Sequence, residues 1–185
     1  ERVQAWVSAY AGRIDDYILF TYHDGGMMGS TSQASNVQAR IAGAEAGATW
    51  QMAEQWSLGG TLAYAWGENR DSGTPLPQMP PLEARVNLEW QGDAWSAGAL
   101  LRGATAQHRV AEGQGHVVAR ALRPSAGFAT LALHAASRIT PSLPARPGVA
   151  TALDRSYSQH PTLSGRPPFG FPADPVRIHE PGRTW

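Results

Sequence analysis

A two-residue alternation of side chains is the feature that most limits what this chain can form. In the segment 56–66 one set of positions carries aromatic and apolar residues with one glycine, and the other carries small or polar residues. The first set is Trp56, Leu58, Gly60, Leu62, Tyr64 and Trp66, and the second is Ser57, Gly59, Thr61, Ala63 and Ala65. Successive side chains of a β-strand point to opposite faces, so the segment is predicted to be a strand with one apolar face.

The segment 82–90 repeats the pattern, with charges on one face. Leu82, Ala84, Val86, Leu88 and Trp90 alternate there with Glu83, Arg85, Asn87 and Glu89. In a membrane β-barrel such charges line the lumen and the apolar side chains face lipid, whereas in a soluble sheet the charges face water. Five charged residues are expected to line a lumen, in contact with each other or with a plug, and an exposed sheet in water is the alternative. They are Glu45, Glu83, Arg85, Glu89 and Arg102.

Aromatic residues bracket the apolar face of the 56–66 segment. Trp56 lies at one end, and Tyr64 and Trp66 lie at the other. At about 3.3 Å per residue and a tilt near 45°, this segment spans roughly 23 Å of height. The apolar band of an outer-membrane barrel is about 25 Å tall and is flanked by aromatic girdles. The spacing therefore favours a membrane barrel.

The connections between the expected strands alternate in length. Further strands are expected at 2–22, 42–50, 95–101 and 127–139. The expected total is about seven strands, plus a stub at 182–185. Short turns at 51–55 and 91–94 contrast with long loops at 23–36, 67–81, 108–126 and 161–180, as in outer-membrane barrels. One aromatic belt is then expected at the short-turn rim, formed by Trp50, Trp56, Trp90 and Trp95.

Composition excludes several classes of function. The chain of 185 residues has no cysteine, which rules out thiol catalysis, disulfides and cysteine zinc sites. Its formal net charge is +0 and its basic residues are dispersed, so no nucleic-acid partner is expected. No apolar run approaches the roughly 18 residues that a spanning helix needs. No nucleophile-elbow motif occurs, and neither catalytic nor cofactor-binding residues are assigned.

Potential metal ligands lie in the long loops. His23 and the pair Met27–Met28 supply imidazole and thioether groups, which suit copper, although a flexible loop with an incidental Met pair is the favoured interpretation. Met79 is expected to pack within its loop. Asp15–Asp16 is expected to be a solvated turn. The metal ligands stay open, because weak metal binding and simple solvation both fit the remaining loop histidines, His108, His116, His160 and His179.

Several longer stretches carry a resemblance to a known family. They are Ala-Tyr-Ala-Trp-Gly-Glu-Asn-Arg at 63–70, Pro-Leu-Pro-Gln-Met-Pro-Pro-Leu-Glu-Ala-Arg at 75–85, Arg-Val-Ala-Glu-Gly-Gln-Gly at 109–115, and Phe-Gly-Phe-Pro-Ala-Asp-Pro-Val-Arg-Ile-His-Glu-Pro-Gly-Arg-Thr at 169–184. In these stretches the chain resembles the C-terminal barrel of TonB-dependent outer-membrane receptors, and most closely their copper receptor subgroup. A departure is the proline-rich stretch 140–147, where the family has a short turn.

The resemblance implies an all-β antiparallel transmembrane barrel of about 22 strands with a plug domain in its lumen. Residues 1–185 are then the C-terminal segment of that barrel, and the plug domain is absent from this chain. The resemblance further implies TonB-dependent transport of a scarce nutrient, with copper as the transported ligand. The implied partners are outer-membrane lipid and, through the plug domain, the TonB complex, and the implied location is the outer membrane of a Gram-negative cell.

Two other classes remain open from the residues alone. A small outer-membrane barrel enzyme needs a convergent serine, histidine and acid on its outer wall, where the cleanest faces carry apolar residues instead. A soluble β-sandwich binding module requires a buried core formed by Leu58, Leu62, Val86 and Leu88.

Overall fold

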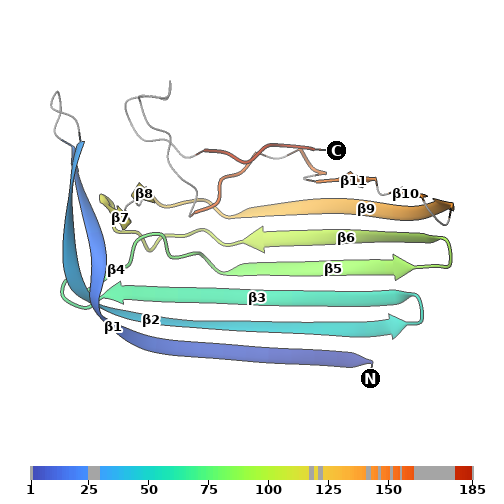
Figure 1. The fold of residues 1–185 in the computed structure, drawn as a ribbon, viewed down its shortest axis with the longest axis horizontal. Helices are drawn as coiled ribbons and strands as arrows, with labels where there is room; N and C mark the ends of the chain where they lie inside the picture. Colours follow the sequence, from blue (N-terminus) through green and yellow to red (C-terminus); the bar gives the residue numbers. More distant parts are fainter. Residues whose placement is uncertain are drawn as a thin grey trace.

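The strands of the described residues form one antiparallel sheet (Figure 1). The structure is a computed structural model that describes residues 2–24, 30–116, 119–120, 123–140, 143–145, 147–150, 152–154, 156–160 and 178–184. The strand order is β10-β9-β6-β5-β3-β2-β1-β7-β8, with β11 paired to β9 and β4 paired to β3. No helix that could cross a membrane occurs in this described part of the chain.

Six long strands make up most of the sheet, and five short ones are added at its edges and in its loops. The long strands are β1 (Val3–Asp24), β2 (Ser30–Ala53), β3 (Trp56–Asn69), β5 (Glu83–Gln91), β6 (Trp95–Ala104) and β9 (Phe128–Thr140). The short ones are β4 (Thr74–Pro75), β7 (Gln114–His116), β8 (Ala119–Arg120), β10 (Leu143–Ala145) and β11 (Gly148–Val149).

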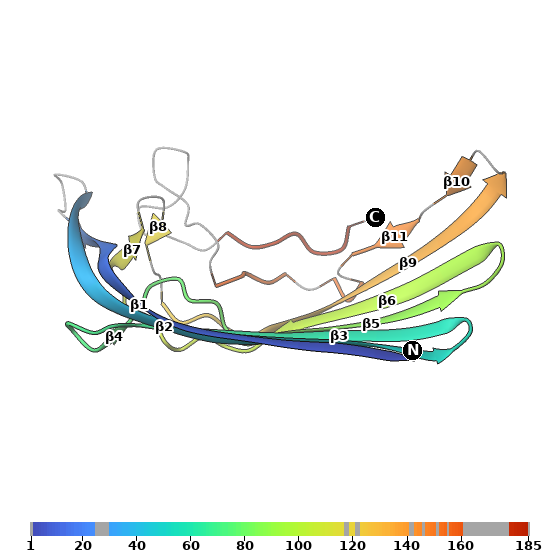
Figure 2. The same cartoon turned by 60° about the horizontal axis from the view of Figure 1, so that its bottom comes forward.

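The sheet is curved, and its long connections lie on the concave side (Figure 2). Gly67 marks that side, because a methyl group added to it would lie 2.9 Å from the Leu76 side chain in the loop above. Trp66 and Tyr64 have the opposite parity to Gly67 along β3, so they lie on the convex face. The predicted alternation is thus confirmed as a difference between a convex and a concave face.

Two glycines of β2 make room for aromatic rings on the concave face. An added methyl group would lie 2.5 Å from the Tyr10 ring at Gly43 and 2.6 Å from the Trp6 indole at Gly47. Both aromatic residues come from β1, whose register places Tyr10 opposite Gly43 and Trp6 opposite Gly47. A side chain at either glycine would have to push a ring aside, which explains the alternating glycines of an otherwise alanine-rich strand.

The first expected loop, 23–36, is wrong. β1 continues to Asp24 and β2 already begins at Ser30, so the two strands stay paired almost to the tip of a long hairpin. The residues from Ser30 to Asn36 are small and polar, which suggested irregular structure. They pair with the segment Ile18–Asp24, which is rich in aromatic and β-branched residues, and this cross-strand pairing outweighs the weak strand propensity of the polar segment.

Asp15 and Asp16 are exposed, as expected, but the predicted turn is wrong because both residues lie inside β1. The pairing shifts by one residue between Ile14 and Tyr17, which is a β-bulge. Asp16 has φ of 58°, and the left-handed region is more accessible to aspartate than to most residues. Bulges increase strand twist and bend, and β1 and β2 curve strongly toward the hairpin tip (Figure 2).

The structure confirms the two expected short turns and contains two of the expected long loops. β2 and β3 are joined through residues 54–55, and β5 and β6 through residues 92–94. β3 continues to Asn69, so the expected loop at 67–81 begins at residue 70, and it contains β4. The described part of the loop at 108–126 contains β7 and β8, whereas 161–177 lies outside the described residues. The expected stub at 182–185 is reduced to a single bridge from Thr184 to Ala150.

A close backbone approach at Gly127 leads to a first prediction. A methyl group there would lie 2.7 Å from the Ala104 carbonyl oxygen and 2.9 Å from the Ala106 nitrogen, both of which are backbone atoms. Gly127→Ala is expected to lower the free energy of unfolding of the intact protein by about 1–3 kcal/mol, because the start of β9 must move. Thermal unfolding measures this loss. Gly60→Ala is the control, since its nearest atom is 3.6 Å away, and an equal shift in both variants would contradict the prediction.

Candidate functional site

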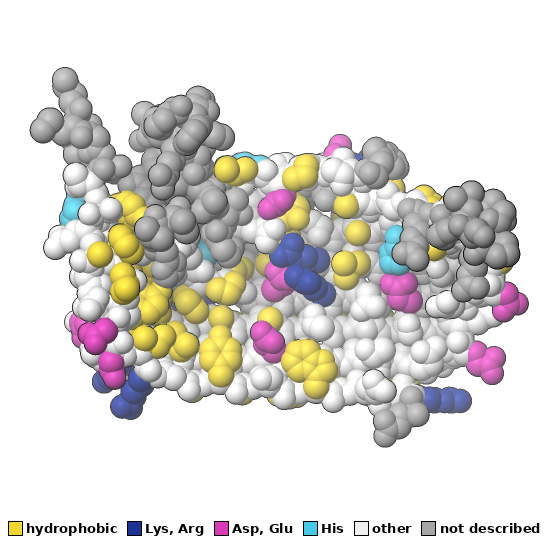
Figure 3. Space-filling model, viewed as in Figure 1, with side chains coloured by type: hydrophobic (Ala, Val, Ile, Leu, Met, Phe, Trp, Pro, Cys, Tyr) yellow, Lys and Arg dark blue, Asp and Glu magenta, His cyan; other side chains and the backbone are white. Residues whose placement is uncertain are grey.

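A charged network occupies the middle of the concave face (Figure 3). The Glu83 carboxylate accepts hydrogen bonds from Arg85 at 2.8 Å and from Arg102 at 2.7 Å. Arg85 and Arg102 are directly opposed on β5 and β6, and two like charges in that position repel each other. Glu83 offsets this repulsion, so the three side chains form one unit.

The same network holds the C-terminal part of the chain. Arg102 also donates a hydrogen bond to Gln159 at 3.0 Å, and Gln159 donates one to Glu180 at 3.1 Å. Tyr157, on the same segment, stacks on Phe128 with ring centroids 4.3 Å apart. The segment 156–160 is therefore attached to the sheet through side chains, and its own described backbone pairing is the isolated bridge from Tyr157 to Glu180.

Glu89 and Glu45 complete the expected lumenal set. Glu89 shares the face of Glu83 along β5, and its carboxylate lies 3.1 Å from His134 Nε2 on β9. Glu45 lies on the same face, because the register places it opposite Ala63, which pairs with Glu83 on its other side. All five predicted charges thus face the concave side. His134 was missed, because the alternation around 127–139 is too irregular to assign its face.

A second cluster ties the two long loops together beyond β5 and β6. Leu76 is 1% exposed, and Gln107 is 3% exposed and donates a hydrogen bond to the Met79 carbonyl oxygen. The guanidinium group of Arg109 donates to the Ala65 carbonyl oxygen at 3.0 Å and lies 5.2 Å from the Tyr64 ring centroid. β5 begins at Glu83, opposite Ala63, so it does not reach Ala65. The Arg109 side chain donates to the Ala65 carbonyl oxygen in place of a neighbouring strand. The predicted packing role of Met79 agrees with its sulfur, which lies over Gly67.

The structure describes only some of the candidate metal ligands. His23, His108 and His179 are exposed, and each comes from a different part of the chain. Met27–Met28 and the His116 side chain lie outside the description. Among the residues that the structure does describe, no group of three or more histidine, aspartate or glutamate side chains is arranged to hold a metal ion.

His160 differs from the solvated loop histidine that was expected. It is 8% exposed, and its Nδ1 lies 2.9 Å from the Ser125 hydroxyl. Ser125 in turn pairs through its backbone with Gln107 of the buried loop cluster. His160 therefore belongs to the packing between the loops and the C-terminal segment, a contact across 35 positions that no local pattern predicts.

The convex face carries the apolar residues and the expected aromatic belt. The register opposes Trp56 to Trp90, and parity places Trp50 and Trp95 on the same face at the short-turn end. Leu62, Val86 and Leu88 are 47%, 43% and 36% exposed, and no second sheet covers them among the described strands. The sandwich alternative, which required these residues to be buried, is wrong.

The network around Glu83 generates a second prediction. Arg102→Met removes two hydrogen bonds to Glu83 and the bond to Gln159, each worth about 1.5–3 kcal/mol when one partner is charged. We expect faster hydrogen exchange in residues 156–160 of the intact protein. Arg85→Met is the control: Arg85 touches only Glu83 within this network and its side chain is 54% exposed. Equal exchange in both variants would contradict an anchoring role for Arg102.

Comparison with known proteins gives a consistent result. The model of a family described as TonB dependent receptor-like, beta-barrel, matches residues 1–149. A solved structure of the copper transporter OprC is 44% identical, with a TM-score of 0.93, over 99% of this chain and 28% of its own. Comparison with the curated proteins gives no match.

More distant solved structures share the fold alone. A mutant ferric enterobactin receptor, PfeA, from Pseudomonas aeruginosa is 18% identical with a TM-score of 0.70, over 99% of this chain and 28% of its own. The ferripyoverdine receptor of the outer membrane of Pseudomonas aeruginosa is 12% identical with a TM-score of 0.62, over 98% and 24%.

The chain thus spans about 28% of the length of its 44% identical relative, so it corresponds to part of such a barrel. The relatives are receptors and transporters, which sets aside the alternative of a small outer-membrane barrel enzyme. The open antiparallel sheet, its apolar convex face and its charged concave face agree with this match. The chain belongs to the TonB-dependent receptor β-barrel family.

Proposed function

We propose that this chain is the C-terminal part of the barrel of an outer-membrane receptor that imports copper with energy supplied through TonB. The observation that carries the proposal is the 44% identity to a copper transporter over 99% of the chain. The ferric enterobactin and ferripyoverdine receptors share the fold at 18% identity or less, so they support only the architecture. The proposal of copper as the cargo rests on the 44% identical relative.

The two faces of the sheet support the membrane part of the proposal. Apolar side chains on the convex face lie between Trp56 at one end and Tyr64 and Trp66 at the other, which suits contact with outer-membrane lipid. The charged network on the concave face suits a polar lumen. In such a receptor a plug domain in the lumen is the part that engages the TonB complex.

The long hairpin supports a metal cargo by its chemistry. His23 is exposed near the end of β1, and Met27–Met28 follow it in sequence. Imidazole and thioether groups favour copper over the hard cations that prefer oxygen ligands. We infer that these three side chains collect copper at the extracellular rim.

The copper proposal predicts a defect in uptake. The triple variant His23→Ala, Met27→Ala, Met28→Ala of the full-length receptor is expected to bind copper at least about tenfold more weakly and therefore to take up less copper at limiting concentrations. Even the loss of outer-shell partners lowers metal affinity by roughly 10–100-fold. Copper-64 uptake into cells that lack their own copper receptor measures this. His179→Ala, which changes another exposed histidine, is the control. Wild-type uptake that continues after deletion of TonB would contradict the proposal.

The lipid-facing position of Val86 gives a separate prediction. Val86→Arg in the full-length receptor is expected to cost about 2–4 kcal/mol, because it places a charge in the hydrocarbon layer. Asn87→Arg is the matched control, since the neighbouring side chain points to the concave face. The folded fraction in outer-membrane preparations, read from heat-modifiable electrophoretic mobility, measures the effect. Normal assembly of the Val86 variant would show that this face does not contact lipid.

A further inference from the structure

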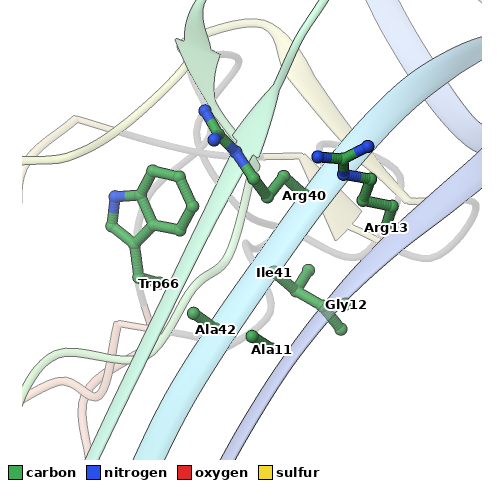
Figure 4. Close-up of a pocket in the computed structure, with 7 residues that line it drawn as sticks. All are labelled: Ala11, Gly12, Arg13, Arg40, Ile41, Ala42 and Trp66. Atoms are coloured by element: carbon green, nitrogen blue, oxygen red, sulfur yellow. The ribbon is translucent and has the colours of Figure 1, made fainter.

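An open pocket lies on the sheet where β1, β2 and β3 run side by side, at the long-loop end of the convex face (Figure 4). Its volume is about 510 Å³. Ala11 and Ala42 keep its base low, and Trp66 lines it from β3. The guanidinium groups of Arg13 and Arg40 project in the same direction from neighbouring strands (Figure 4). The pocket therefore combines a small apolar base, one aromatic side chain and two cations.

The positive charge of this pocket is only partly balanced. Arg13 and Arg40 are directly opposed in the register, an arrangement that is destabilising for like charges. Arg40 forms an ion pair with Glu68 at 2.8 Å and lies 5.6 Å from the centroid of the Trp66 ring. Arg13 has no ion pair within the described residues. Of the two guanidinium groups, that of Arg13 is thus the one without a carboxylate partner among the described residues.

The carboxylates next to Arg13 in sequence and space do not form ion pairs with it in the described structure. Asp15 and Asp16 follow it in the bulge, but neither forms an ion pair with it in the described structure. The Asp71 carboxylate accepts a hydrogen bond from the Gln38 backbone N–H. Arg40 uses one guanidinium nitrogen toward Glu68, so donors remain for a second acceptor. An anion between the two guanidinium groups would therefore remove a repulsion.

The position of Arg13 and Arg40 along the strands of the convex face indicates which kind of anion they can bind. Arg13 and Arg40 lie one outward-facing row beyond Trp66, toward the long loops. Aromatic residues of a membrane protein concentrate at the level of the lipid head groups. Below this row the face is apolar and open, with Val7 80% and Leu62 47% exposed. A molecule with a phosphate at the arginines and acyl chains along these residues fits both parts of the surface.

We propose that Arg13 and Arg40 form a binding site for the phosphate group of a phosphorylated lipid in the outer leaflet. The planar guanidinium group presents paired donors that match phosphate geometry, and two of them face one space here. Glu68 and Trp66 hold Arg40 in place, and Arg13 supplies the unpaired charge. The inference rests on the proposed outer-membrane placement and is independent of the transported cargo.

The test uses the purified full-length receptor in a non-ionic detergent, titrated with bisphosphorylated lipid A and followed by native mass spectrometry. The double variant Arg13→Gln, Arg40→Gln is expected to bind the lipid about tenfold more weakly or worse, as expected when a charged hydrogen bond is lost. Arg2→Gln is the matched control, because it removes an exposed arginine at the short-turn end and should leave binding unchanged.

Three outcomes would overturn the proposal. Equal binding by the double variant and the wild type would show that the arginines are not the site. Equal binding of dephosphorylated lipid A would show that apolar contact alone is responsible. Displacement of the lipid by an equal concentration of inorganic phosphate would identify a site for free anions. Cell fractionation of the same strains reports separately whether the receptor reaches the outer membrane, so a failure of that placement is distinguishable.

Discussion

The cross-strand register of β2, β3, β5 and β6 is the constraint on which the rest of the structure depends. It keeps the apolar residues on the convex side and the charges on the concave side. A slip of one residue in β5 would move Glu83, Arg85 and Glu89 to the convex face and Val86 and Leu88 to the lumen. Because both faces would then be wrong at once, the alternative register is strongly disfavoured. Short turns at 54–55 and 92–94 fix the pairing locally, and Trp56 opposite Trp90 fixes it at the rim.

The concave face shows how a sheet without a packed core can still be specified in detail. The described buried apolar residues, such as Leu19, Ala39 and Leu76, lie toward the long loops. Elsewhere on this face the contacts that order the side chains are polar or involve single aromatic rings. Arg102 joins β6 to β5 through Glu83 and to the C-terminal segment through Gln159. Trp6 and Tyr10 lie over glycines of the neighbouring strand, which lets large rings lie close to the backbone. These contacts connect strands that are far apart in sequence and complement the backbone ladder.

The strands that cross the apolar band were predictable because their signal is local. A period of two and the placement of tryptophan identify 56–66 and 82–90 with both of their faces, and the five lumenal charges follow. The errors lie where the deciding contact is distant. Polar residues from Ser30 onward form a strand because an aromatic-rich segment pairs with them, and His160 is buried because Ser125, from another loop, lies beside it. Asp16 adopts a left-handed conformation inside a strand, which its sequence neighbours do not reveal.

The long-loop half of the sheet is stabilised by a different means from the half that crosses the apolar band. Above Ala63 and Ala104 the ladder between β5 and its neighbours stops, and loop residues take over: Arg109 satisfies the Ala65 carbonyl, and Gln107 joins both loops. The same loop reaches β1, where β7 pairs with Phe20 and Thr21 beyond the bulge. This pairing attaches the loop to β1 on the hairpin side of the bulge. The bulge and the β7 contact therefore act together, because one bends the hairpin and the other holds it against the loops.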